Sequence, residues 1–132
     1  MSLDAVNRML LVNKQMEMSC SAMQDAELLL RERRANSAAG RIYYSVFHAV
    51  SALLIYDGIR IKSHKGAYTM FCLHYVNAGK VPQEYGKWYR DLELMREESD
   101  YNCFYNVEAD ELEQKLDSAK EMIETIAKMI KD

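Results

Sequence analysis

Two side chains in the most apolar stretch of the sequence could act together on a phosphate ester. Arg41 and His48 are seven residues apart, so on a helix they lie on one stripe, about 10 Å apart along the axis, with Tyr44 at its edge. Histidine exchanges a proton near neutral pH, and arginine offers a planar fork of donors to phosphate oxygens. This combination suits metal-independent cleavage of RNA, in which a base deprotonates the 2′-hydroxyl and a cation stabilises the developing phosphorane.

The same spacing also fits a structural interpretation. In this alternative Arg41 pairs locally and His48 is hydrogen-bonded inside a helical bundle, because a buried polar group costs free energy unless it has a partner. Arg-x6-His is a short pattern that arises often by chance, so both interpretations stay open.

A second pair lies later in the chain, where Arg96 precedes Asp100 and Tyr101. Spacing of four places Arg96 and Asp100 on one helix face, and the simplest interpretation is a helical ion pair worth about 0.3–0.5 kcal/mol. The acid stands on the C-terminal side, the less favourable orientation near the negative end of a helix. We therefore expect a tertiary partner for this pair, namely Arg41 or His48.

The third candidate is the basic loop Lys62-Ser-His-Lys-Gly66, which contains His64. A basic loop that leads into a helix N-terminus can hold a phosphate, or it can be a solvated loop with Ser63 as the helix cap. The histidines lack paired cysteine or acidic spacing, and the sequence has no glycine-rich phosphate loop. We predict neither a metal site nor a cofactor.

The charges are unevenly distributed along the chain. The net charge of −3 argues against general coating of nucleic acid, but residues 31–65 hold seven bases and two acids. Such a basic centre in an acidic frame could receive a phosphate-bearing ligand, although an ordinary mixed surface has the same composition.

Composition and periodicity predict an all-α protein. An apolar fraction of 49% with a single proline favours helices over a β-sandwich or barrel. No stretch approaches about 18 uninterrupted apolar residues, and no secretory signal is visible, so we expect no membrane span. The three cysteines are odd in number and far apart, which indicates reduced thiols and a cytoplasmic location.

The expected architecture is an up-and-down antiparallel bundle of about five helices in one domain, residues 1–132. The predicted helices cover 2–34, about 38–57, 63–76, 82–100 and 107–131. Asn36 and Ser37 form the first turn and supply the next cap, Gly58 ends the central helix, and Pro82 opens the fourth helix. In the first helix we expect the inward stripe to contain Leu3, Val6, Leu10, Cys20, Met23 and Leu30.

These motifs together resemble the HEPN domain family of small prokaryotic helical proteins. The resemblance rests on Arg41-Ile-Tyr-Tyr-Ser-Val-Phe-His-Ala49, on Lys62-Ser-His-Lys-Gly66, on Gly79-Lys-Val-Pro82 and on Arg96 leading to Asp100-Tyr101 before a long final helix. It implies an up-and-down bundle that often pairs as a homodimer. Many members are metal-independent ribonucleases of toxin–antitoxin, phage-defence or RNA-processing systems, and others work beside a minimal nucleotidyltransferase.

Position by position, Arg96 matches the arginine of the family's Arg-x4–6-His ribonuclease motif, while Asp100 stands where the histidine would be. Tyr101 lies near the tyrosine that partner nucleotidyltransferases modify in some systems. Two interpretations follow from the resemblance. In the first, the protein binds RNA or nucleotide and cleaves RNA: the catalytic residues are His48 as base, Arg41 and Arg96 as phosphate ligands and Asp100 as orienter, and the ligand-binding residues are Tyr44, Lys62, His64 and Tyr101. In the second, the site is not catalytic and the protein docks on a nucleotidyltransferase.

Overall fold

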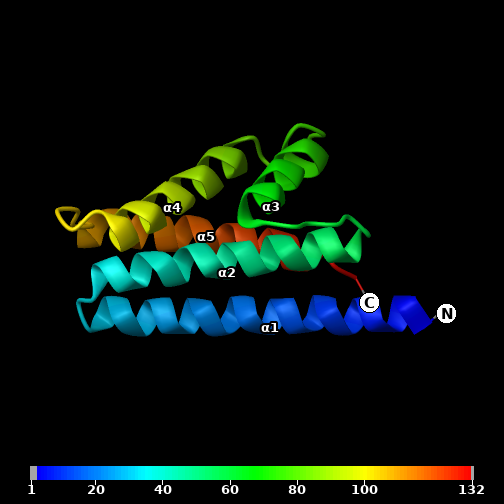
Figure 1. Ribbon diagram of the computed structural model, residues 1–132, viewed down its shortest axis with the longest axis horizontal. Coiled ribbons are helices and arrows are strands. Elements are labelled where there is room, and N and C mark those ends of the chain that lie inside the picture. The colour runs from blue at the N-terminus through cyan, green and yellow to red at the C-terminus, as the bar shows by residue number, and fades with distance from the viewer. Residues whose placement is uncertain (1–2, 132) are drawn as a thin grey trace.

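The computed structural model describes residues 3–131, which form five α-helices and no strand. They are α1 (Leu3–Arg31), α2 (Ala35–Tyr56), α3 (His64–Phe71), α4 (Glu84–Tyr101) and α5 (Ala109–Met129), and α3 runs on into a π-helical turn, Cys72–Val76. Figure 1 shows α1, α2 and α5 along the long axis of the molecule, with α3 and α4 leaning across one side. The predicted all-α bundle is confirmed.

Helix α2 is the centre of the bundle and contacts each of the other four helices. Its sequence explains this position, because small residues such as Ala38, Ala39 and Ala49 are fully buried and let neighbouring helices approach. Larger buried side chains fill the space between them, among them Ile42, Val50, Leu53 and Leu54. The helix is also long and apolar enough to meet a length-and-hydropathy criterion for a membrane span, but 67% of that window is buried inside the bundle.

The first turn lies earlier than the sequence predicted. Helix α1 ends at Arg31, and Arg33 takes the left-handed conformation, with φ 61°, that reverses the chain. Helix α2 then starts at Ala35, with Arg34 before it and no side-chain cap. Asn36 and Ser37 therefore lie inside the first turn of α2, and the prediction that they form the turn and its cap is wrong.

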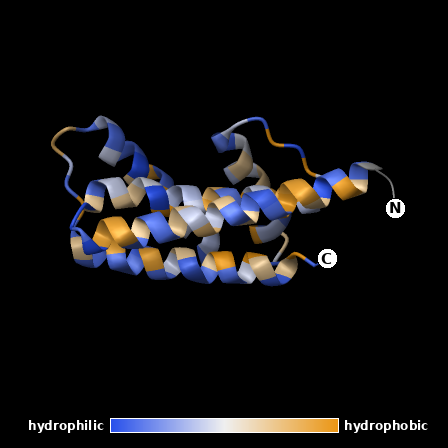
Figure 2. Cartoon of the chain, turned by 90° about the horizontal axis from the view of Figure 1, so that it is seen from below, coloured by the Kyte–Doolittle hydropathy of each residue, from blue (hydrophilic) through white to orange (hydrophobic). Residues whose placement is uncertain are grey.

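The inward face of α1 also differs from the predicted stripe. Val6, Leu10 and Cys20 are exposed, Leu10 by 62%, whereas Met23 is buried. The remaining buried positions of this helix are small or polar: Val12, Ser19, Ala22 and Ala26. Ser19 donates a hydrogen bond to the Ser45 carbonyl (2.6 Å), so a polar contact helps to hold α1 on α2. Figure 2 shows hydrophobic segments along α1, whose N-terminal end is labelled.

The connection before α3 follows the predicted turn chemistry, and the connection after it differs from the prediction at Pro82. Gly58 takes a positive φ of 74° after α2, and the Ser63 hydroxyl caps α3 by accepting from the Gly66 amide at 2.9 Å. Pro82 lies two residues before α4 rather than inside its first turn, and its carbonyl accepts from the Tyr85 amide. These turns bring the start of α3 back beside the middle of α2.

Candidate functional site

Tyr44 is surrounded by four basic side chains from three helices. The guanidinium carbons of Arg41 and Arg96 lie 5.0 and 5.8 Å from its ring centroid. The ring centroids of His64 and His48 lie 5.7 and 6.3 Å from it. We call these five residues the Tyr44 cluster. The cluster brings His64 of α3 and Arg96 of α4 together with Arg41 and His48 of α2.

Arg96 approaches the cluster from α4 and passes over α2 beside Gly40. A Cβ atom at Gly40 would lie 4.0 Å from Arg96 Cγ, at van der Waals contact. The Arg96 guanidinium carbon lies 4.9 Å from the Tyr43 centroid, and the side chain is only 15% exposed. Its Nε is buried without a hydrogen-bond partner. Burial lowers the pKa of Arg96, but Tyr44, Tyr43, Asp100 and a hydrogen bond with Tyr101 outweigh it and raise the pKa.

His64 is fixed in place by two aromatic residues of α2. Its ring stacks on Phe47, with the centroids 4.2 Å apart and the planes at 14°. Its Nδ1 lies 3.0 Å from the Tyr43 hydroxyl. Burial, followed by the charge of Glu93, raises the pKa of Tyr43 well above its ordinary value, so this hydroxyl keeps its proton. The tautomer of His64 decides which of the two groups donates in their hydrogen bond.

His48 is arranged to remain neutral and to accept a proton. Its Nδ1 lies 2.8 Å from Gln15 Oε1 on α1. As the amide is assigned, this carbonyl oxygen only accepts, so the proton of the neutral ring is on Nδ1 and Nε2 is the basic nitrogen. Burial, and then the charges of Arg41 and His64, lower the pKa of His48. A histidine with this tautomer and a lowered pKa can act as a general base.

Asp100 and Tyr101 lie at the Arg96 edge of the cluster. Asp100 pairs with Arg96 on its own helix at 3.4 Å, and its side chain is 46% exposed. Between residues 3 and 131 the structure contains no ion pair of Asp100 with Arg41 or His48. The tertiary partners of Arg96 are thus the rings of Tyr43 and Tyr44. Tyr101 is 80% exposed and bonds Arg96.

The predicted residues do not all line one groove. His64 and Arg96 border a groove of about 480 Å³ between α3 and α4, together with Arg90, Glu93 and other residues. Arg41, Tyr44 and His48 are not among its lining residues. Lys62 lies apart from this groove and borders a hollow beside α1.

Three residues that position the cluster were missed from the sequence. Tyr43 and Phe47 stand in the apolar stretch of the central helix and were not predicted as site residues, although both contact His64. Gln15 is 33 positions from His48 in the chain. A tyrosine in an apolar face is a usable signal, because a buried hydroxyl needs a hydrogen-bond partner. No sequence signal marks Gln15.

Comparison with known proteins agrees with this fold. Residues 12–130 match the family model of the HEPN domain. A UPF0332 protein of Thermotoga maritima is 36% identical over 110 residues, which cover 83% of either chain. A protein of Methanocaldococcus jannaschii named "Putative toxin MJ0605" is 30% identical over 107 residues, 81% of this chain and 79% of its own. A second from the same organism, "Putative toxin MJ0142", is 27% identical over 102 residues, 77% of this chain and 69% of its own.

Proposed function

This chain belongs to the HEPN domain family, and two of its relatives carry the name "Putative toxin". We propose that it is a toxin-like protein that binds single-stranded RNA at the Tyr44 cluster and cleaves it without a metal. The observation that carries the proposal is the placement of Arg41, His48, His64 and Arg96 around one aromatic ring. Guanidinium groups bind phosphate oxygens, and aromatic rings stack on unpaired bases. We place this activity in the cytoplasm.

The proposed reaction is a transesterification. His48 Nε2 removes the proton of the 2′-hydroxyl, the 2′-oxygen attacks the adjacent phosphorus, and the 5′-oxygen of the next nucleotide leaves. The leaving oxygen takes up a proton from the surrounding water, to which His48 releases the proton that it removed. Arg41 and Arg96 stabilise the charge on the phosphorane oxygens. The products are a 2′,3′-cyclic phosphate and a 5′-hydroxyl.

The test is cleavage and binding of labelled single-stranded RNA in the presence of EDTA. We expect His48→Gln to abolish cleavage while leaving binding within a few fold, and Arg41→Ala to weaken binding. His74→Gln is the matched control, because it removes a histidine outside the cluster. Cleavage by His48→Gln at the wild-type rate contradicts the catalytic part of the proposal. Absence of cleavage by the wild-type protein contradicts it as well. Absence of RNA binding by the wild-type protein contradicts the whole proposal.

A second candidate function follows from the loop after α4. Tyr101 is 80% exposed and Phe104 is 89% exposed, and exposed aromatic side chains are typical anchors in protein interfaces. In this alternative the loop docks on a partner protein such as a minimal nucleotidyltransferase. A second copy of the chain is another candidate partner for the loop. Co-purification that survives Arg41→Ala with His48→Ala but fails with Tyr101→Ala and Phe104→Ala favours it.

A further inference from the structure

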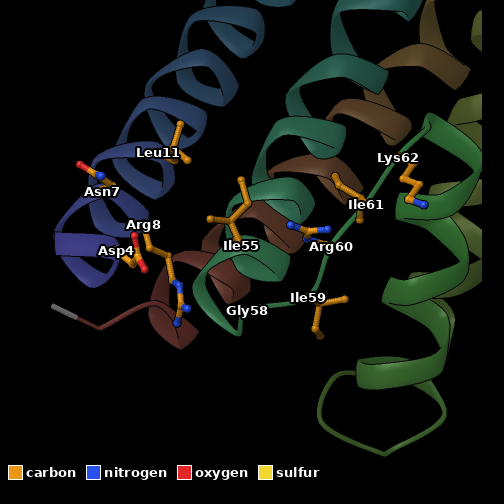
Figure 3. Close-up of a pocket in the computed structure, with 10 residues that line it drawn as sticks. All are labelled: Asp4, Asn7, Arg8, Leu11, Ile55, Gly58, Ile59, Arg60, Ile61 and Lys62. Carbon is orange, nitrogen blue, oxygen red and sulfur yellow. The ribbon is translucent and has the colours of Figure 1, made fainter. Parts of the chain in front are cut away.

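A basic hollow lies at the other end of α2 from the first turn. It has a volume of about 580 Å³ and opens between the N-terminal part of α1 and the segment 58–62. Figure 3 shows Arg8 entering from α1, and Arg60 and Lys62 from the connecting segment. Asp4 is the one acidic residue that lines it. The volume is within the range of small-molecule sites, and three cations face one acid.

These cations are available to a ligand. Within residues 3–131, none of Arg8, Arg60 and Lys62 takes part in an ion pair. The backbone amides of residues 60–62 likewise donate no hydrogen bond in the described part of the chain. Cationic side chains and free amides in an extended segment are groups that bind phosphate oxygens.

The shape of the hollow depends on Gly58 and on apolar side chains. Gly58 has a positive φ of 74°, which favours glycine, and a Cβ atom there would lie 3.8 Å from the guanidinium of Arg8, so the α1 cation lies against this turn. Leu11 and Ile55 also line the hollow, and apolar side chains of this kind pack against a ribose or a base edge. The site thus offers both charge and an apolar surface.

The hollow continues the stripe that carries the Tyr44 cluster. Ile55 is seven residues beyond His48, as His48 is seven beyond Arg41, so the three follow one side of α2 at intervals of about 10 Å. The segment after Gly58 then leads back to His64, which stacks on Phe47. Lys62 is two residues from His64 and borders the hollow. The Tyr44 cluster and the hollow therefore lie one after the other along the same side of α2.

We propose that the hollow binds backbone phosphates of the same RNA strand whose neighbouring nucleotides occupy the Tyr44 cluster. This inference rests on the proposed function and adds a second subsite to it. Its consequence is a length requirement: a strand long enough to reach from the cluster to Arg8 and Arg60 binds more tightly than a short one, with a steeper dependence on salt.

The test compares three proteins with a trinucleotide and a twelve-nucleotide RNA, by fluorescence anisotropy over a series of salt concentrations. The proteins are the wild type, the triple variant R8A/R60A/K62A and the charge-matched control K14A/K87A/K128A. The control lysines are highly exposed, and each forms an ion pair within its own helix. Circular dichroism establishes that all three proteins are folded.

We expect the triple variant to bind the long RNA at least tenfold more weakly than the control does. The slope of log K against log salt should also be smaller by about 2, because each of the three lost phosphate contacts contributes about 0.7. For the trinucleotide, the difference in affinity between triple variant and control should be much smaller than for the long RNA. Equal binding of the long RNA by triple variant and control overturns the subsite but leaves the proposed function standing. Absence of binding by the wild type at both lengths overturns the proposed function itself. Binding of inorganic phosphate that needs Arg8 and Arg60, with RNA affinity unchanged, would assign the hollow to free phosphate and also overturn the inference.

Discussion

The guanidinium of Arg96 lies 4.9 Å from the centroid of the Tyr43 ring and joins α4 to α2. Tyr43 is fully buried, and the Arg96 side chain is 15% exposed. A cation at this depth requires compensation. The ring faces of Tyr43 and Tyr44 and the carboxylate of Asp100 provide it. The arginine is thus anchored by aromatic rings, in a way that a lysine cannot reproduce.

Arg96→Lys should lower the free energy of unfolding by about 1 kcal/mol, because the planar stack on a buried ring is lost while the charge remains. Urea denaturation measures this value. Arg90→Lys is the control, since Arg90 is on the same helix and its half-exposed side chain pairs with the buried carboxylate of Glu93 instead of a ring. Equal destabilisation by the two substitutions would contradict the anchoring role of the Tyr43 ring.

Tyr43→Phe should cost about 1 kcal/mol, because it removes the hydrogen bond to His64 but keeps the ring. A double-mutant cycle with His64→Ala isolates that bond: in the presence of His64→Ala, the hydroxyl should contribute much less. The free energy of unfolding of the four proteins gives the coupling. Strictly additive effects would show that the two side chains do not interact.

The fold could be predicted because the helices of this chain are long and periodic, and because Gly58 and Ser63 are strong local signals. The first turn could not, since it contains no glycine and Arg33 adopts the left-handed conformation instead. The stripe of α1 was wrong for a related reason. Its contact with α2 uses Ser19 and alanines, which carry little hydrophobic signal, while several of its large apolar residues face outward.

The site was predictable only in part. Helical spacing places Arg41, Tyr44 and His48 together, and the sequence also marks His64 and Arg96 as residues that could do chemistry. Their convergence on Tyr44 depends on the crossing of α4 over Gly40 and on the return of the chain to Phe47. These are tertiary relationships, and the periodicity of one helix does not contain them.

Asn36→Ala should lower the free energy of unfolding by about 2 kcal/mol, since its side chain makes two hydrogen bonds to the loop before α5. The amide nitrogen donates to the Tyr105 carbonyl at 2.9 Å, and the oxygen accepts from the Val107 amide at 3.0 Å. Ser37→Ala is the control, because Ser37 is exposed inside the helix and should change stability by less than about 0.5 kcal/mol. A larger loss from Ser37→Ala than from Asn36→Ala would restore Ser37 as a cap.

His48 should make the protein less stable in acid. Its pKa is lowered in the folded state by burial and by Arg41 and His64, so below its ordinary value of 6.5 the unfolded chain binds a proton more readily than the folded chain does. The free energy of unfolding therefore falls as the pH drops from about 6.5 through the lower pKa of the folded protein. Urea denaturation between pH 5 and 8 measures this change.

His48→Gln should flatten that acid-side decrease, whereas His74→Gln should leave it unchanged. The same titration governs the proposed catalysis, because His48 acts as a base only when it is neutral. Cleavage of RNA should therefore keep more than half of its full rate at pH 6.5 and fall at lower pH. A rate that declines already between pH 8 and 7 would require a base with a higher pKa than His48, and would remove this histidine from the reaction.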